Sequence, residues 1–546
     1  MAKANNGIFP SDKYKMSAIK RLSFFIISFL ILVCYIIILF PSCQEYKRNK
    51  SHADILVSGI EKGKVLAAQY CQSCHLLPDP SLLDSKSWEK GVLPQMGPRL
   101  GIFNFNFTGY PSQKYDYNLD RNFYPSQPVL RYDEWQNIID YYTAVSPDTI
   151  IIGKDQDQPI KDSLPLFSAI VPSFTYSTPA TSFVKIDESV PDHRLIINDV
   201  VKQTTYILNK NLKKHDSIHT KGPVVDIEVH KNEWIECNIG ILNPHNGKYG
   251  KAQKIQVKKD GKLKEDTAAL FDKLARPVQV MSVDINKDGR EDYVVCEFGY
   301  LQGSLSWMEN AGNKKFNRHI LRPLPGAIKV YVQDYNKDGL PDIWALFSQG
   351  EEGVFLFTNK GNGQFDQKQV LRFPSVYGSS YFEFADFNKD GFPDIVYTCG
   401  DNADFSPILK PYHGVYIFIN DGKYNFKQQY FFHINGCYKA IARDYDNDGD
   451  IDIAAISYFA DYKRRPEEGF VYLENKGDLK FSANSLPQTQ SGRWLTMDAG
   501  DLDGDGKIDL VLGNFIIAPT MMKSKADWKK GPPFLILKNR GKQFKL

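Results

Sequence analysis

An acidic nine-residue motif occurs five times in the second half of the chain. Its first copy reads Asp284-Ile-Asn286-Lys-Asp288-Gly289-Arg-Glu-Asp292. The first aspartates of successive copies lie 50, 52, 58 and 57 residues apart. A regular period of this length is typical of a repeat fold, in which each unit packs against its neighbours. This repeat constrains the fold more than any other feature of the 546-residue sequence.

The four later copies keep the same pattern, with Asp or Asn at the third position, glycine at the sixth and aspartate at the first, fifth and ninth. Their side-chain oxygens belong to Asp334, Asn336, Asp338 and Asp342; to Asp386, Asn388, Asp390 and Asp394; to Asp444, Asp446, Asp448 and Asp452; and to Asp501, Asp503, Asp505 and Asp509. Such a fixed arrangement of oxygen side chains predicts one recurring binding loop.

Short strand-like runs flank each copy, such as residues 329–332 before one motif and 343–347 after it. About four strands per repeat correspond to one blade of a β-propeller. The unit resembles the FG-GAP or VCBS repeats of integrin α-chains and many secreted bacterial proteins. The resemblance implies an all-β propeller. Residues 224–229 and 181–198 resemble two degenerate units, so we expect seven blades over residues 176–546, with six as the alternative.

Each acidic loop is predicted to bind calcium. Oxygen ligands at positions 1, 3, 5 and 9, with a backbone carbonyl at position 7, suit a hard cation, and glycine at position 6 permits the sharp turn. The pattern matches the front of an EF-hand loop, but strands flank it and the later glutamate is missing, so an EF-hand is not expected. Asx turns without metal are the alternative. Because empty loops would gather like charges, we expect about five structural calcium ions.

A Cys71-Gln72-Ser73-Cys74-His75 pentapeptide lies near the start of the chain. C-x-x-C-H is typical of covalent haem c attachment: two thiols bond the haem and the histidine ligates its iron. A thioredoxin-like pair or half a zinc site would be the alternatives. Neither a βαβ context nor a second C-x-x-C is present. We therefore expect one haem c.

The surrounding residues resemble class I c-type cytochromes, in which a first helix enters the C-x-x-C-H turn and a second helix crosses it. Residues 53–70 and 131–145 have the apolar spacing of these two helices, and the second ends before Ser146-Pro147. The resemblance implies a small all-α cytochrome c domain over residues 52–150. Gly59 and Gly63 lie on one face of the first helix and would allow close packing.

Met96 is the predicted sixth iron ligand, because class I cytochromes usually use a methionine thioether. It lies 21 residues after His75 in the sequence Leu93-Pro94-Gln95-Met96-Gly97-Pro98, which the two prolines predict to be a loop. A methionine that only packs is the alternative. His52 is the other candidate ligand, but it precedes the first helix.

The amino terminus has the pattern of an export signal. Five basic residues between Lys3 and Arg21 precede an uncharged apolar run from Phe24 to Phe40. Pro41-Ser42-Cys43 resembles a lipobox, which implies acylation of Cys43. The run is also long enough for an uncleaved membrane helix. Residues 1–51 are therefore expected to anchor an extracytoplasmic protein to a membrane, and the proline-bearing residues 151–175 are expected to be a linker.

The remaining residues exclude several classes of function. A formal net charge of +3 argues against nucleic-acid binding through a strong positive field. No nucleophile elbow, phosphate loop or HExxH motif occurs. Cys237, Cys296, Cys399 and Cys437 are expected to be buried thiols, since two of them fall on equivalent strands of different blades.

Three functions fit these features. The first is an exported, non-enzymatic electron carrier, in which haem c exchanges electrons with a redox partner protein and the propeller docks that partner. The second is an oxidoreductase whose propeller binds a substrate or organic cofactor and passes electrons to the haem. The third is a surface adhesion or glycan-binding propeller with an attached cytochrome.

Overall fold

The structure is a computed structural model. It describes residues 48–542 except 113, 154, 155, 157, 267, 404 and 518–525. The predicted export signal, the apolar run and Cys43 lie outside the described residues. Among the residues that are described, no helix is long and apolar enough to cross a membrane. Residues 49–546 form one compact unit.

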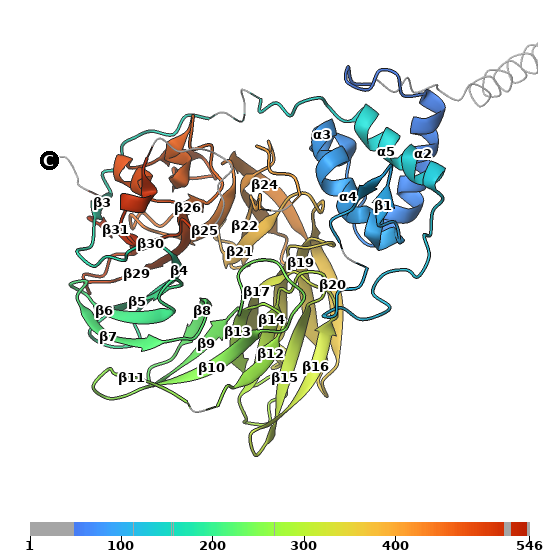
Figure 1. The fold of residues 1–546 in the computed structure, drawn as a ribbon. Helices are drawn as coiled ribbons and strands as arrows, with labels where there is room; N and C mark the ends of the chain where they lie inside the picture. Colours follow the sequence, from blue (N-terminus) through green and yellow to red (C-terminus); the bar gives the residue numbers. More distant parts are fainter. Residues whose placement is uncertain are drawn as a thin grey trace, which may run out of the picture. The chain divides into compact units, whose positions relative to one another are not determined.

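The first part of this unit is a small helical domain (Figure 1). Its elements are α2 (Val57–Tyr70), η1 (Cys71–Ser73), η2 (Pro80–Leu82), α3 (Ser85–Ser87), η3 (Trp88–Val92), α4 (Leu93–Met96), η4 (Gly97–Leu100), β1 (Asn104–Phe105), β2 (Thr108–Gly109) and α5 (Tyr132–Val145). The two long helices agree with the ranges expected from the sequence. Glu134 caps α5 by accepting a 2.9 Å hydrogen bond from the Arg131 N–H, and the helix ends at the residue before Ser146.

Helices α2 and α5 pack closely because α2 carries a glycine at the contact. A Cβ on Gly63 would lie 1.8 Å from the carbonyl oxygen of Asn137 and 2.8 Å from Cβ of Tyr141. Only a residue without a side chain fits there, since these neighbours are backbone and the base of a side chain. Ile60 and Ala67 on the same face of α2 are fully buried. The glycine that weakens α2 as a helix thus positions it against α5.

The expectation that Met96 lies in a loop is wrong. Residues 85–100 are helical throughout: a π-turn, η3, is followed directly by α4 and then by the 3-10 turn η4. Pro94 and Pro98 each stand in the first turn of their own short helix, where a missing N–H costs nothing. Gly101, with φ 78°, then ends the run. Met96 is the last residue of α4 and is half-buried.

The second part is a β-propeller of seven sheets (Figure 1). The first sheet contains β4 (Thr181–Asp187), β5 (Arg194–Asp199), β6 (Thr204–Asn209) and β7 (Lys214–His219). The second contains β8 (Val224–Val229), β9 (Glu233–Asn238), β10 (Gly250–Val257), β11 (Leu263–Glu265) and β12 (Phe271–Leu274). The third contains β13 (Pro277–Val283), β14 (Asp292–Glu297), β15 (Ser304–Gly312) and β16 (Lys315–Arg322).

The other four sheets repeat the same antiparallel order. The fourth contains β17 (Ala327–Gln333), β18 (Asp342–Phe347), β19 (Gly353–Asn359) and β20 (Phe365–Arg372). The fifth contains β21 (Ser379–Ala385), β22 (Asp394–Cys399), β23 (Gly414–Asn420) and β24 (Phe426–His433). The sixth contains β25 (Cys437–Arg443), β26 (Asp452–Ser457), β27 (Phe470–Asn475) and β28 (Phe481–Asn484). The seventh contains β29 (Trp494–Gly500), β30 (Asp509–Asn514), β31 (Phe534–Asn539) and β3 (Phe167–Ile170).

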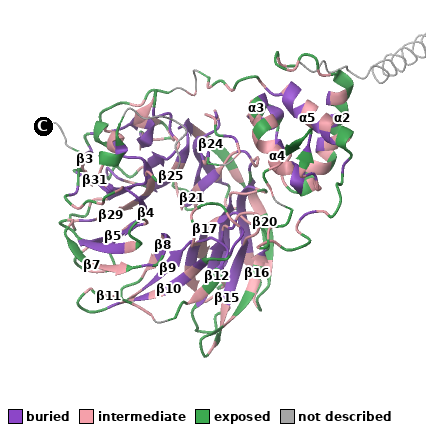
Figure 2. Ribbon diagram, in the orientation of Figure 1, coloured by how far each residue is buried: buried purple, intermediate pink, exposed green. Residues whose placement is uncertain are grey.

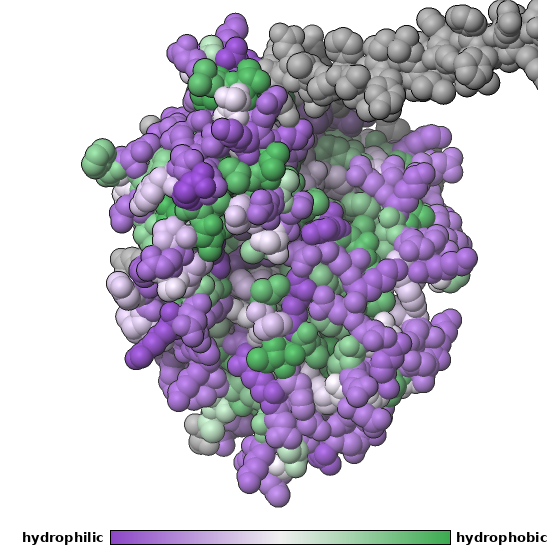
Figure 3. All heavy atoms as spheres, turned by 90° about the vertical axis from the view of Figure 1, so that its right-hand side faces the viewer, coloured by the Kyte–Doolittle hydropathy of each residue, from purple (hydrophilic) through white to green (hydrophobic). Residues whose placement is uncertain are grey.

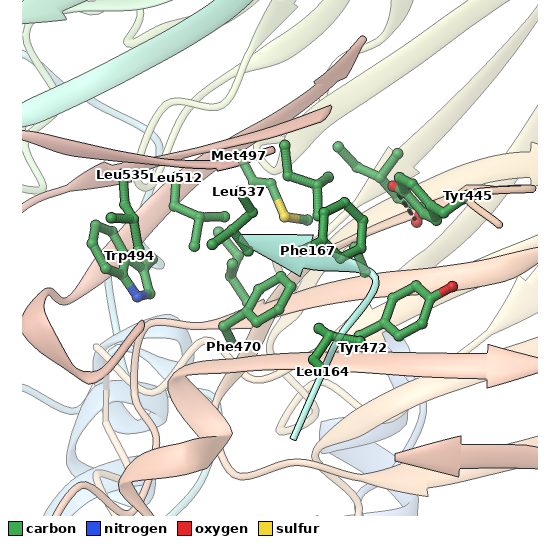
Figure 4. Packing of buried hydrophobic residues seen from close by; sticks show 14 of the residues in the cluster. Leu164, Phe167, Tyr445, Phe470, Tyr472, Trp494, Met497, Leu512, Leu535 and Leu537 are labelled. Carbon is green, nitrogen blue, oxygen red and sulfur yellow. Dashed lines mark hydrogen bonds between the residues drawn. The ribbon is translucent and has the colours of Figure 1, made fainter. Parts of the chain in front are cut away.

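The propeller closes through β3, which precedes the first blade in sequence but completes the last. It pairs antiparallel with β31, with Phe167 opposite Asn539. Figure 4 shows Phe167 packed among Tyr445, Tyr472 and Leu537 of the last two blades. The segment predicted to be a linker therefore contains a structural strand. Its pairing ties the two ends of the propeller together and covers the outer edge of β31.

Seven blades confirm the number predicted from the five acidic repeats and the two degenerate units. The first strand of every blade contacts the first strand of the next, from β4 through β29 and back to β4, so these inner strands form a closed ring. Buried residues concentrate on the second and third strands of the blades, and the outer strands are more exposed (Figure 2). The surface in Figure 3 is mostly hydrophilic, with scattered hydrophobic groups.

Candidate functional sites

All five acidic loops connect the first strand of a blade to its second strand, and all have the same internal hydrogen bonds. In the loop that begins at Asp284, one carboxylate oxygen accepts from the N–H of Asp288 at 3.1 Å and the other from the N–H of Gly289 at 2.9 Å. The same two bonds occur from Asp334, Asp386, Asp444 and Asp501. The first aspartate therefore holds the loop in a tight turn by accepting two backbone hydrogen bonds.

Two positions in each loop have left-handed backbone. The sixth is always glycine, with φ between 80° and 90°. The fourth is Lys287, Lys337, Lys389, Asn447 or Gly504, with φ between 58° and 81°. The sequence reasoning missed the fourth position, although Asn447 and Gly504 are residues that favour this conformation. The two left-handed residues allow the tight turn in which the first aspartate accepts from the N–H groups at positions 5 and 6.

The ninth aspartate anchors each loop to its blade. Asp292, Asp342, Asp394, Asp452 and Asp509 begin the second strands and are at most 2% exposed. In Asp394, one oxygen accepts from the N–H of Phe387 and the other from the N–H of Asn420, both at 2.9 Å. Burial, and then the neighbouring acids, raise the pKa of Asp394 to about 6. A bound cation would offset this cost of burying a charge.

An Asn-x-Gly sequence completes the anchor, and the sequence reasoning did not find it. At Asn359 the backbone N–H donates to Asp342 at 2.9 Å, the side-chain amide donates to the Pro341 carbonyl at 3.2 Å, and the amide oxygen accepts from the Gly361 N–H at 2.9 Å. The same bonds occur at Asn310, Asn420, Asn475 and Asn539. A recurring Asn-x-Gly at the end of each third strand was the available sequence signal.

The last two loops carry an aspartate rather than an asparagine at position 3. In each, the carboxylates at positions 1, 3 and 9 offer oxygens within 4.8 Å of one another: Asp444, Asp446 and Asp452, and Asp501, Asp503 and Asp509. Oδ1 of Asp503 is buried without a hydrogen-bond partner. Nζ of Lys542 lies 2.7 Å from Asp446 and 2.8 Å from Asp448, and Lys538 contacts Asp503. These loops therefore gather cations, and the donor set fits calcium.

The C-x-x-C-H segment begins where α2 ends. Cys71 opens the 3-10 turn η1 and is half-buried, whereas Cys74 is exposed, and both are free thiols. Burial, and then the charge of Cys74, raise the pKa of the Cys71 thiol to about 11. The two thiols are unconstrained by a disulfide and follow the helix directly, as thioether attachment of a haem requires.

His75 is oriented by the backbone. Its Nδ1 lies 2.9 Å from the carbonyl oxygen of Leu76, to which it donates a hydrogen bond. This bond fixes the ring orientation and leaves Nε2 as the atom that would ligate a haem iron. His52 instead contacts Asn49 and Ser85 at 3.1 and 3.2 Å.

Contacts within the compact unit connect the helical domain to the propeller. The hydroxyl of Tyr412 donates to the Leu82 carbonyl at 3.1 Å, and the side-chain amide of Asn246 donates to Asp116 at 2.8 Å. Tyr412 and Asn246 lie in connections between the second and third strands of their blades, whereas the acidic loops connect first and second strands. The four propeller cysteines Cys237, Cys296, Cys399 and Cys437 are fully buried free thiols.

The FG-GAP-like repeat family matches residues 284–345, 334–397 and 444–512. Each match begins at an acidic loop and ends beyond the next, so the matches include all five loops. The chain therefore contains FG-GAP-like repeats within a seven-bladed β-propeller.

The chain is also similar to cartilage acidic protein 1 of Xenopus tropicalis, at 30% identity over 186 residues, which cover 31% of this chain and 26% of that protein. It thus spans about a quarter of that relative's length. Among solved structures, BBS1N in complex with ARL6DN, soaked with mercury, matches at 11% identity with a TM-score of 0.41, over 68% of this chain and 96% of the other. A chain of the S. cerevisiae complex of dbp5, nup159 and gle1 matches at 9% identity with a TM-score of 0.38, over 68% of this chain and 92% of the other.

Proposed function

We propose that this chain is an exported electron-transfer protein, in which residues 52–150 hold one haem c and the propeller is braced by about five calcium ions. The observation that carries the proposal is the C-x-x-C-H segment on the end of α2, with two free thiols and a histidine whose Nδ1 is engaged by the backbone. Haem supplies reversible one-electron chemistry. The chain attaches it through Cys71 and Cys74 and ligates its iron through His75.

Met96 is the proposed sixth ligand. It is half-buried at the end of α4, and the helical run of residues 85–100 holds its backbone more firmly than a loop would. A thioether at this position favours ferrous iron and raises the potential. An anchored, extracytoplasmic location through residues 1–51 and acylation of Cys43 complete the proposal, with a redox protein as partner.

Two other candidate functions would give the propeller a ligand of its own. An oxidoreductase would bind a substrate in the propeller and pass its electrons to the haem. A surface-binding propeller would use the haem domain only as an attached module. Reduction of the haem when purified protein meets a substrate would favour the oxidoreductase over the other two.

The first test of the haem is covalent attachment. The protein is expressed with a cytochrome c maturation system, and its haem should survive denaturation and acid–acetone extraction, since thioethers do not dissociate. Replacing both Cys71→Ser and Cys74→Ser should give a colourless protein, whereas Cys237→Ser, in the propeller, should leave the colour unchanged. Full covalent haem in the double variant would contradict the assignment.

The second test concerns the iron ligand. Met96→Ala should abolish the weak long-wavelength band of a methionine–iron bond in the oxidised protein and lower the potential. Met281→Ala, which changes a methionine on the propeller strand β13, serves as the control. A band that persists in Met96→Ala would assign the sixth position to another residue.

A further inference from the structure

The inner strands place one residue from each blade at the same level of the ring. The level is defined by the pairing of the first strand of each blade with its second strand. In every blade this pairing has one register shift near the start of the first strand, and the residue directly after the shift is equivalent from blade to blade. Lys329 lies there opposite Leu346, and Lys439 opposite Ile456. The seven residues at this level are Phe183, Asp226, Gln279, Lys329, Tyr381, Lys439 and Thr496. The inner strands that carry them surround the axis in Figure 1.

The carboxylates two residues further along the inner strands form hydrogen bonds and ion pairs with neighbouring blades. Glu228 accepts from the Ser282 N–H of the next blade at 2.8 Å. Asp498 accepts from the N–H of Ile186 at 2.8 Å and pairs with Lys185 at 3.3 Å. Glu383 likewise accepts from the next blade and pairs with Arg443 at 3.2 Å. These groups join neighbouring blades and have their partners.

Two lysines at the level of Tyr381, Lys329 and Lys439, do not form a direct ion pair of this kind. Nζ of Lys329 and Nζ of Lys439 lie 5.9 and 4.9 Å from the ring centroid of Tyr381, whose blade stands between theirs. Within the described part of the chain neither lysine is ion-paired to a carboxylate, and Lys439 donates to the carbonyl of Met497 at 2.8 Å. All three side chains are half-buried, so solvent reaches them. Two positive charges thus converge on one aromatic ring.

The electrostatics agree with this geometry. Burial lowers the pKa of Lys439 to about 8; Asp498 opposes this shift, and the positive charges of Lys329 and Lys185 add to it. An anion between the lysines would remove the repulsion between them.

Asp226 lies at the same level of the ring on another blade. It belongs to the second blade, and the lysines belong to the fourth and sixth, yet its carboxylate interacts electrostatically with both. Groups on blades so far apart meet only across the axis. No described residue donates a hydrogen bond to Asp226, which leaves it to accept from a hydroxyl group.

We propose that the axis of the propeller is a binding site for a small hydroxylated carboxylate, of the sugar-acid type. Lys329 and Lys439 bind the carboxylate, Tyr381 packs against the carbon skeleton, and Asp226 accepts from a hydroxyl. The site uses none of the acidic loops and no residue of the C-x-x-C-H segment, so it is independent of haem and calcium.

The test is titration calorimetry on the full chain with calcium, using glucuronate as the probe and glucose as its neutral counterpart. We expect saturable binding of glucuronate and none of glucose. Lys329→Met and Lys439→Met should each weaken binding about tenfold, because each removes a charged hydrogen bond. Lys329→Arg, which keeps the charge, should retain binding, as should Lys427→Met on the outer strand β24.

Melting temperatures of the variants show whether they fold. Asp226→Asn should weaken glucuronate but not acetate, which lacks the hydroxyls. Absence of saturable glucuronate binding, or binding unchanged in both lysine variants, would overturn the proposal. Equal affinity for phosphate and glucuronate would overturn the assignment to a hydroxylated carboxylate.

Discussion

The seven blades divide into two groups that differ in how the first strand is connected to the second. Five blades connect their first and second strands through an acidic loop, and two, β4–β7 and β8–β12, do not. Both groups build antiparallel sheets with buried middle strands, such as β5 and β14. An acidic loop is therefore not needed for a blade to form.

The first blade carries an internal cation where the five acidic blades carry an anion. Its second strand begins with Arg194, at the position where theirs begin with aspartate. Nε of Arg194 lies 2.6 Å from Oδ2 of Asp187, both side chains are nearly buried, and the guanidinium lies 5.3 Å from the ring centroid of Trp234. Here an ion pair within the chain does what an external cation is proposed to do elsewhere.

The second blade has no buried charge to neutralise at this position, because the connection between its first and second strands is short. Only residues 230–232 separate β8 from β9, too few to form an acidic loop. Glu233, which begins β9, is half-exposed and contacts Lys254 at 2.7 Å. The comparison teaches that the proposed calcium dependence belongs to the five acidic blades and not to the fold as a whole.

The sharpest way to test this comparison is to remove calcium from the whole propeller. A ligand present at about 100 times its dissociation constant stabilises each site by about 2.7 kcal/mol, so emptying about five sites should lower the melting temperature strongly. Hydrogen exchange should increase first in β13–β31, because only these blades hold acidic loops. Calorimetry with and without chelator, combined with exchange by mass spectrometry, measures both effects.

A single-loop control accompanies the chelation. Asp386→Ala with Asp390→Ala should remove about one ion by elemental analysis and lower the melting temperature by a correspondingly smaller amount than the chelator does. Melting unchanged by the chelator would show that the loops are metal-free turns. Uniform exchange over all seven blades would contradict a calcium effect confined to the acidic blades. The haem spectrum should not respond to either change.

The sequence was sufficient to predict the propeller because its information is local and repeated. Each acidic loop lies between alternating apolar runs, so five blades follow from one motif, and the degenerate units at 181–198 and 224–229 follow by their spacing. The closing strand β3 could not be predicted, because its partner β31 lies more than 350 residues away and its own sequence is short and surrounded by prolines.

The candidate site residues were chosen from the sequence by the chemistry and spacing of their side chains, and their roles stay predictions. Cys71, Cys74, His75 and the loop aspartates are recognisable from spacing alone. The helical setting of Met96 was missed because prolines normally end helices, and here each one begins a new turn. The Asn-x-Gly anchor was missed because its role depends on a hydrogen bond from another strand to the ninth aspartate.

The next prediction tests the internal cation of the first blade. Arg194→Met should cost about 3–5 kcal/mol, because it leaves Asp187 buried without its partner. The loss should be the same with and without calcium, unlike that of any acidic loop. Lys480→Met, which breaks an exposed pair with Asp478 at 3.6 Å, should cost less than about 1 kcal/mol. Denaturant unfolding at both calcium levels provides the measurement.

A compensated variant distinguishes the ion pair from simple packing. Replacing Asp187→Leu together with Arg194→Met should recover much of the loss, since no charge remains buried. A calcium-dependent loss in the single variant would mean that the first blade also holds a metal, and the division into two groups would fail.

The smallest expected effect is a pH dependence of the free energy of unfolding that calcium cannot remove. Glu236, in the second blade, is 2% exposed, and burial raises its pKa from 4.5 to about 8, with Lys251 opposing the shift. The folded protein then holds a proton that the unfolded chain releases. The stability that this proton provides is complete below about pH 4.5 and is lost as the pH rises toward 8. Saturating calcium leaves the effect in place, because this blade has no acidic loop.

Glu236→Gln should remove this dependence, because glutamine carries no charge at any pH. With calcium saturating, we expect the wild-type protein to lose about 1–3 kcal/mol between pH 5 and pH 9 relative to the variant. Asp272→Asn, on the exposed part of β12 in the same sheet, is the control and should follow the wild-type curve. If Glu236→Gln instead ran parallel to the wild-type curve, the decline would originate elsewhere. If raising calcium abolished the decline in stability with pH, the titrating groups would lie in the acidic loops. The second blade would then contribute no pH dependence of its own.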